Sequence, residues 1–267
     1  MGFRFALAAI LAACIGTVLP AKAQDAGLKS LQTGNDSRGW EAVGRLNLGE
    51  RGFCTGALIA EDLVLTAAHC LFDKETGARI DARTIEFLAG WRNGRAAAYR
   101  GVVRAEAHPE YVYGGHDDVD RVQFDVALIK LDQPIRLPSI QPFATDDRPT
   151  AGDEVGVVSY AQDRSEAPSL QQLCHVLDRR TGMLVLSCDV DFGSSGAPGF
   201  SMRDGDLRIV SVVSAKAEMA GRKVALGTPL AAPVALLRHM MAEGGSRQQP
   251  ANVRVLSGGG GGKFVKP

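Results

Sequence analysis

The sequence predicts an all-β protein. Short runs rich in Val, Ile and Leu recur along the chain, and Gly, Asp, Asn or Pro bounds each of them, a pattern typical of sandwiches and barrels. Only one stretch has the length and apolar period of a convincing helix, so alternating βαβ units are not indicated. With 267 residues, of which 45% are hydrophobic, the chain is long enough to build a packed core.

The chain begins with an expected secretory signal over residues 1–23. Arg4 precedes an apolar run, 5–19, and an Ala-Lys-Ala site ends the segment. Because the run is short for a bilayer span, we expect export to the periplasm or the exterior, a mature chain starting near Gln24 and no membrane contact after signal removal. "LAAC" also has the small-residue pattern that precedes a lipid-modified cysteine, which leaves lipidation of Cys14 as the alternative.

The charge of the mature chain argues against nucleic-acid binding. Of 30 basic residues, Arg4 and Lys22 leave with the signal, so 28 remain against 30 acidic residues. Neither sign gathers into a basic face or run, which is the electrostatic footprint that a nucleic-acid partner requires.

Two sets of strands are expected in the mature chain, separated by the Pro-containing stretch 137–153. The sequence "RDGD" at 203–206 predicts a tight hairpin turn in the second set. The expected units are an N-terminal segment over 24–39, a first β domain over 40–145 and a second over 146–232. The predicted strands are 41–48, 53–60, 63–70, 84–90, 99–108 and 125–131, then 154–161, 170–178, 183–190, 207–215 and 223–230.

One helix is predicted over 233–243, after the second set of strands. Pro233 suits its first turn and Gly244 its end, while its apolar positions form one face for packing against a β core. The remainder, 244–267, is rich in Gly and poor in apolar residues, so we expect a flexible tail.

Four cysteines remain after signal removal, which suits two disulfides in an exported protein. Three connectivities are open. We favour Cys54 with Cys70 and Cys174 with Cys188, because each pair ties together a local strand-turn-strand unit. The spacings are not those of a zinc site, and neither a metal nor a cofactor is expected.

Three separated segments contain the residue types that acyl transfer requires. His69 ends an apolar run, Asp125 opens another, and two serines lie in the Gly-rich stretch "DFGSSGAPGF". A buried carboxylate needs a donor such as an imidazole N–H, and a hydroxyl nucleophile needs that imidazole as its base. Glycines beside the serine would let backbone N–H groups approach an oxyanion.

The segments "TAAHC", "DVALIKL" and "GSSGAP" resemble the three signature segments of the trypsin-like (chymotrypsin-fold) serine peptidases, in that family's order. The resemblance covers about Trp40 to Leu237. It implies two six-stranded antiparallel β-barrels, with the site in the cleft between them. It also implies that Ser195 is the nucleophile, and that the N–H groups of Gly193 and Ser195 form the oxyanion hole.

The chain departs from the animal digestive branch of that family at two places. Ser194 stands where that branch has an Asp that binds a newly freed amino terminus, and the segment 24–40 lacks an Ile-Val-Gly-Gly start. We therefore predict that the oxyanion loop is ordered without such activation. Cys188, seven residues before the nucleophile, is closer to the bacterial glutamyl-endopeptidase (V8-like) branch.

The resemblance leaves the substrate preference open. Asp189 stands where trypsins have the carboxylate that binds Lys or Arg, but the same Cys-Asp pair resembles V8-like enzymes, whose preference is not basic. Asp191 is a second available carboxylate. Lys216 would narrow the pocket or attract an acidic side chain, and Ser214 is expected to bind the substrate backbone.

The sequence thus predicts a secreted or periplasmic serine endopeptidase whose partner is a protein or peptide substrate. The alternative is a non-catalytic binding protein on the same fold, since a fold does not fix an activity. The carboxylates in "HDDVD", 116–120, lack the spacing of a calcium loop and are interpreted as a solvated loop. The sequence gives no indication of the oligomeric state.

Overall fold

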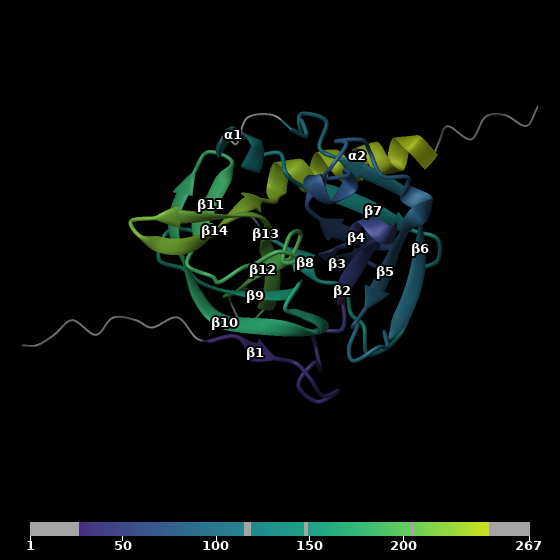
Figure 1. Ribbon diagram of the computed structural model, residues 1–267, viewed down its shortest axis with the longest axis horizontal. Helices are drawn as coiled ribbons and strands as arrows, with labels where there is room; N and C mark the ends of the chain where they lie inside the picture. The colour runs from purple at the N-terminus through teal and green to yellow at the C-terminus, as the bar shows by residue number, and fades with distance from the viewer. Residues whose placement is uncertain (1–26, 115–118, 147–148, 204–205, 246–267) are drawn as a thin grey trace, which may run out of the picture.

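The structure is a computed structural model that describes residues 27–114, 119–146, 149–203 and 206–245. The expected signal at 1–23 with Cys14, most of "HDDVD" and the tail beyond 245 lie outside the described residues. Within the described residues, no helix combines the length and the apolar character needed to cross a membrane. The all-β prediction is confirmed, with two β structures side by side and one long helix (Figure 1).

The first barrel closes in the order β2-β3-β4-β7-β6-β5, and all its pairs are antiparallel. Its β3 strand is buried along nearly its whole length, because one face fills the barrel and the other packs against neighbouring elements. The strands are β2 (Val43–Leu48), β3 (Phe53–Ala60), β4 (Leu63–Thr66), β5 (Ile85–Ala89), β6 (Ala98–Ala107) and β7 (Ala127–Leu131).

The second set of strands also closes into a ring of six, because β9 pairs with both β10 and β12. Two short strands, β1 (Lys29–Ser30) and β8 (Ala144–Thr145), add to its edges, and β8 is parallel to β13. The ring strands are β9 (Glu154–Ala161), β10 (Arg164–Arg180), β11 (Met183–Leu186), β12 (Pro198–Arg203), β13 (Asp206–Met219) and β14 (Arg222–Pro229).

An aromatic cluster joins the two barrels. Trp40 lies edge-on to Phe200 with ring centroids 5.0 Å apart, and Phe143 packs on the same Phe200 ring at 4.7 Å. Edge-to-face pairs of this kind stabilise by about 0.5–1.5 kcal/mol beyond their burial. Phe143 lies in the stretch that connects the barrels, so the connection is itself part of the shared core.

The C-terminal helix α2 (Ala231–Gly245) lies over the first barrel although it follows the second in sequence (Figure 1). Val234 and Leu237 are buried in the core on its apolar face. Arg238 donates a hydrogen bond to the carbonyl of Ile59. A segment from the end of the chain therefore fixes the barrel that carries the first half of the candidate site.

Some predicted elements have different bounds in the structure. The expected strand over 63–70 ends at Thr66 and continues as a 3₁₀ turn, η2 (Ala68–Leu71), because the chain must turn where the disulfide and His69 are placed. The strand expected over 170–178 is part of the longer β10. Strand β12 was not predicted, because Pro198 and the glycines before it indicate a loop.

Other short elements carry no period long enough to predict. They are η1 (Gly49–Arg51), η3 (Ala82–Thr84) and α1 (Val119–Val122).

Candidate active site

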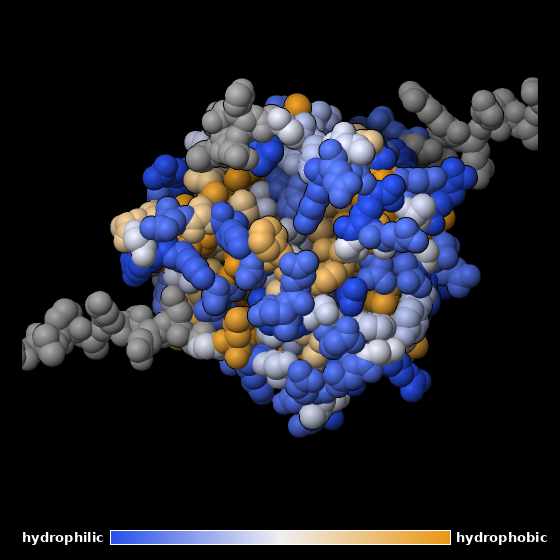
Figure 2. Space-filling view, in the orientation of Figure 1, coloured by the Kyte–Doolittle hydropathy of each residue, from blue (hydrophilic) through white to orange (hydrophobic). Residues whose placement is uncertain are grey.

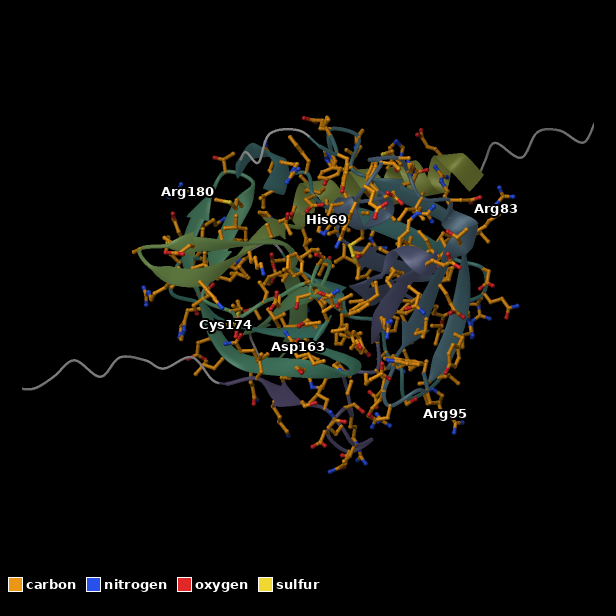
Figure 3. The ribbon with its side chains drawn as sticks, viewed as in Figure 1. His69, Arg83, Arg95, Asp163, Cys174 and Arg180 are labelled. Carbon is orange, nitrogen blue, oxygen red and sulfur yellow. A yellow bond between two sulfur atoms is a disulfide. The ribbon has the colours of Figure 1, made fainter. Side chains whose placement is uncertain are left out.

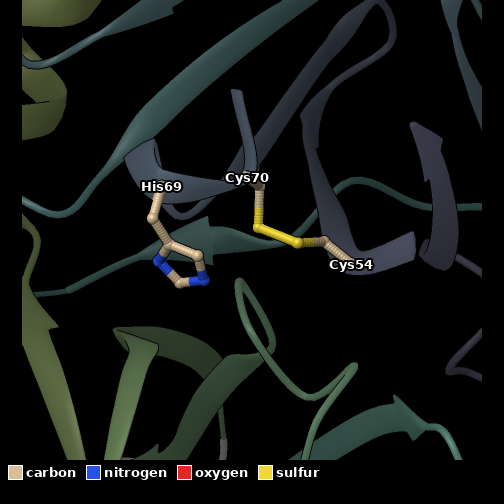
Figure 4. A group of neighbouring side chains, drawn as sticks. All are labelled: Cys54, His69 and Cys70. Carbon is tan, nitrogen blue, oxygen red and sulfur yellow. A yellow bond between two sulfur atoms is a disulfide. The ribbon is translucent and has the colours of Figure 1, made fainter. Parts of the chain in front are cut away.

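His69 lies on the turn that follows β4, between the two barrels (Figure 3). Its neighbour Cys70 forms a disulfide with Cys54 on β3, and the imidazole ring extends from the same turn beside that bond (Figure 4). The other disulfide joins Cys174 and Cys188 in the second barrel. These are the two pairings favoured on the sequence, and the first one anchors the backbone of His69 to the barrel wall.

The carboxylate of Asp125 binds His69 with both of its oxygens. Its Oδ2 lies 2.7 Å from His69 Nδ1, and its Oδ1 accepts the backbone N–H of His69 at 2.8 Å. Two contacts to one residue fix both the position and the rotation of the imidazole, and they leave Nε2 as the ring nitrogen available for a proton.

Asp125 is only 3% exposed, so its charge depends on the donors around it. Burial alone would raise the pKa of Asp125, but the charge of His69 and the hydrogen bonds from His69 and Ser214 together lower it below its ordinary value. The Ser214 hydroxyl donates directly to Oδ2. The carboxylate is therefore held ionised inside the protein, as an orienting group for an imidazole must be.

Ser195 lies on a tight turn that the first barrel supports. Its carbonyl accepts the backbone N–H of Thr55 at 2.9 Å. Gly193 has φ +95°, and a Cβ there would lie 2.6 Å from the ring of Phe53, so only glycine fits this position. The predicted oxyanion residues thus lie on a backbone whose shape depends on the absence of a side chain.

Ser194 is fully buried, so a substrate cannot reach its hydroxyl. Its hydroxyl lies 3.2 Å from the hydroxyl of Ser159 and 3.5 Å from a guanidinium nitrogen of Arg164. Arg164 also donates to both oxygens of Ser159 at 3.1 Å. Burial lowers the pKa of Arg164, an effect opposed by the nearby carboxylates of Asp163, Asp189 and Asp191. A largely buried guanidinium therefore bonds the serine that stands where the digestive branch has a carboxylate.

Ser195 and Ser214 line one pocket, and Ser214 is bonded to the carboxylate that binds His69. The three predicted catalytic segments therefore meet in one region of the molecule. Across the described residues, the Ser195 hydroxyl has no hydrogen bond within 3.5 Å. Such bonds are often long in enzymes without substrate and tighten in the complex.

The pocket beside Ser195 has a volume of about 260 Å³. Of the predicted substrate residues, Ser214 and Lys216 line it, but Asp189 does not. Asp189 is exposed, and its backbone N–H donates a hydrogen bond to Gln171 Oε1 at 2.6 Å. The full lining is Val190, Asp191, Phe192, Ser195, Val213, Ser214, Ala215 and Lys216.

Cys54, Cys70 and His69 also lie close enough together to suggest a metal centre. Both sulfurs are joined in the disulfide, so neither provides the thiolate that metal binding requires.

Two contributors to the site are not predicted from the sequence: Thr55, which supports the Ser195 turn, and Arg164, which bonds Ser194. Ser214 is predicted to bind the substrate backbone, but the bond of its side chain to Asp125 is not. Nothing in the local pattern marks a Thr in an apolar strand or an Arg after a turn, because their partners lie far away in the sequence.

Comparison with known proteins shows a match over most of the chain. The sequence model of the Trypsin family matches residues 32–233. Serine protease 23 of Mus musculus is 27% identical over an alignment of 161 residues, and the match covers 54% of this chain and 42% of that protein. The Homo sapiens protein of the same name is 26% identical over 161 residues, with the same shares. The chain thus spans less than half the length of these relatives.

A solved structure of a Glu endopeptidase in complex with MPD has the same fold. It superposes with a TM-score of 0.65 at 18% sequence identity, and the match covers 82% of this chain and 98% of that one.

Proposed function

The chain belongs to the Trypsin family of serine peptidases, and from this premise we propose that it is an endopeptidase that cuts peptide bonds through an acyl-enzyme. Ser195 attacks the carbonyl carbon of the peptide bond, while His69 accepts the hydroxyl proton and later gives it to the leaving amine. Asp125 orients His69, and the N–H groups of Gly193 and Ser195 bind the oxyanion.

The observation that carries this proposal is the double contact of Asp125 with His69, at 2.7 Å and 2.8 Å, beside a pocket lined by Ser195. A buried carboxylate placed in this way holds the neighbouring imidazole in the orientation and tautomer that a general base needs. The disulfides support export to the periplasm or the exterior, where they persist.

The ordering of the Ser195 turn without a new amino terminus also belongs to this proposal. Ser194 cannot form the ion pair of the digestive branch. Its buried hydroxyl instead meets Ser159 and the guanidinium of Arg164. These contacts come from within the second barrel, so the turn is supported in a chain that has not been cut.

A fluorophosphonate probe tests the proposed function, because it reacts with an activated serine and not with an ordinary one. We expect stoichiometric labelling of the oxidised protein, with the label on Ser195 by mass spectrometry. Ser195→Ala should abolish labelling and lower kcat by on the order of 10⁴ to 10⁶. Ser194→Ala is the register control, since this serine is buried and the label should remain.

The alternative is a binding protein on the same fold. It predicts no labelling and no cleavage of a diverse peptide mixture by protein with both disulfides formed. Labelling at Ser194 in place of Ser195 would show instead that the nucleophile is assigned to the wrong serine.

A further inference from the structure

Half of the residues that line the pocket beside Ser195 are apolar. These residues are Val190, Phe192, Val213 and Ala215. Figure 2 shows hydrophobic side chains interspersed with hydrophilic ones near the centre of the face in view. A closed apolar cavity of about 150 Å³ holds a benzene molecule. The 260 Å³ found here therefore has room for a branched aliphatic or aromatic side chain.

The lining also contains one acid and one base, and these bind each other. Lys216 Nζ lies 2.9 Å from Asp191 Oδ1. Of the residues that line the pocket, these are the charged ones. The pocket therefore has no net charge, although both signs of charge lie at its wall.

Further contacts hold both members of this pair. Asp191 Oδ1 also accepts the backbone N–H of Phe192 at 2.8 Å. The hydrogen bond from Lys216, and then that from Phe192, lowers the pKa of Asp191, so the carboxylate stays ionised. The Lys216 ammonium lies 4.1 Å from the centroid of the Phe192 ring, within cation–π range. The cation is thus directed toward the pocket wall.

We propose that the Asp191–Lys216 pair makes this pocket select uncharged, apolar side chains at P1, the residue whose carbonyl Ser195 attacks. Asp191 and Lys216 are then the specificity-determining residues, one excluding acidic and the other excluding basic side chains. This inference rests on the proposed peptidase function.

The selection follows from the charges that an entering side chain would meet. A Glu side chain would be attracted by Lys216 and repelled by the Asp191 carboxylate bonded to it. A Lys side chain would be attracted by Asp191 and repelled by Lys216. Attraction and repulsion then largely cancel, while the entering charge still loses its water. An apolar side chain loses no such hydration and gains from burial against the four apolar walls.

Removal of one member should leave the charge of the other without its partner. Both side chains are about half exposed, at 51% for Lys216 and 56% for Asp191. A pair this exposed adds little to stability, so single substitutions should leave the fold intact. Asp191→Asn leaves an unpaired ammonium at the wall, and Lys216→Met leaves an unpaired carboxylate.

The test uses three peptide substrates that differ only at P1, which is Leu, Glu or Lys, with kcat/KM measured per labelled active site. For the unsubstituted protein we expect the Leu peptide to be cleaved at least about tenfold faster than the others, a difference that corresponds to about 1.4 kcal/mol. Asp191→Asn should raise the Glu/Leu ratio about tenfold, and Lys216→Met should raise the Lys/Leu ratio similarly.

Lys223→Met is the matched control, since Lys223 acts on Asp191 through its charge but does not line the pocket. It should leave all three ratios nearly unchanged. The inference is overturned if the unsubstituted protein prefers the Glu or Lys peptide, or if the two single variants fail to shift in opposite directions. Protein that reacts with no fluorophosphonate and cleaves none of the peptides contradicts the peptidase proposal instead.

Discussion

The hydroxyl of Thr55, on the first barrel, donates a 2.9 Å hydrogen bond to the carbonyl of Gly193, on the turn that carries Ser195. The same hydroxyl accepts the backbone N–H of Tyr160 at 3.0 Å, and the Thr55 backbone N–H bonds the carbonyl of Ser195. One residue of the first barrel thus makes three hydrogen bonds to the second, two of them beside the proposed oxyanion hole.

Thr55→Val should keep the shape of the side chain but remove its hydroxyl. Loss of the buried partner leaves the Gly193 carbonyl and the Tyr160 N–H unsatisfied, at a cost of about 1–3 kcal/mol. We expect the free energy of unfolding in urea to fall by this amount and kcat to fall with little change in KM. Thr55→Ser restores the hydroxyl and should recover most of both; equal loss in the two variants would mean that the hydroxyl has no such role.

Arg164→Met should remove the donors that reach Ser159 and Ser194 while keeping much of the buried volume. The Arg164 side chain is only 15% exposed. Without it, the hydroxyls of Ser159 and Ser194 keep their hydrogen bond to each other but lose the guanidinium donor. We expect slower fluorophosphonate labelling of Ser195 and a lower kcat, with KM nearly unchanged, because the turn is less well positioned. Arg92→Met, which removes another cation that bonds a serine, is the control and should leave the labelling rate intact.

The two disulfides should differ in their effect on activity. Replacement of Cys174 and Cys188 by Ala opens a link with a sequence separation of 14 residues, which in the chain-entropy model costs about 3 kcal/mol. Replacement of Cys54 and Cys70 should cost a similar amount and also free the turn of His69. Urea unfolding and kcat measured on both double variants check this, and an equal fall in kcat would contradict it.

Asp73 provides a pH-dependent contribution to the loop that follows His69. The backbone N–H of Thr76, a hydrogen bond from Arg51 and further donors of the same loop lower its pKa from 3.8 to about 2. A carboxylate whose pKa is lower in the folded than in the unfolded state stabilises the fold at any pH above its unfolded-state pKa. This stabilisation is lost as the pH falls through the folded-state pKa. Between pH 4 and 2, the melting temperature of Asp73→Asn should therefore depend less on pH than that of the unsubstituted protein.

Most of the strands can be predicted from local patterns, because each has its own run of apolar residues with turn residues at both ends. Strand β3 over Phe53–Ala60 and strand β9 over Glu154–Ala161 have the predicted bounds. Prediction failed where tertiary context decides. Pro198 begins β12 because the strand starts as the Ser195 turn ends, and His69 leaves its strand early because a disulfide fixes the turn.

The candidate site divides in the same way. His69, Asp125 and Ser195 could be proposed because each lies in a distinctive segment of the sequence. Thr55 and Arg164 could not, since their importance arises only from carbonyls and hydroxyls that folding brings to them. The acid and base of the pocket were visible separately as Asp191 and Lys216, but not their contact, which joins residues 25 positions apart.

Gly196, directly after Ser195, has φ +77°, and a methyl group there would lie 2.1 Å from Thr66 Oγ1 and 2.4 Å from the Thr55 carbonyl. The turn that carries Ser195 therefore packs directly against the wall of the first barrel. An isolated second barrel lacks this packing surface. We therefore expect the proposed peptidase activity only after the two barrels have docked.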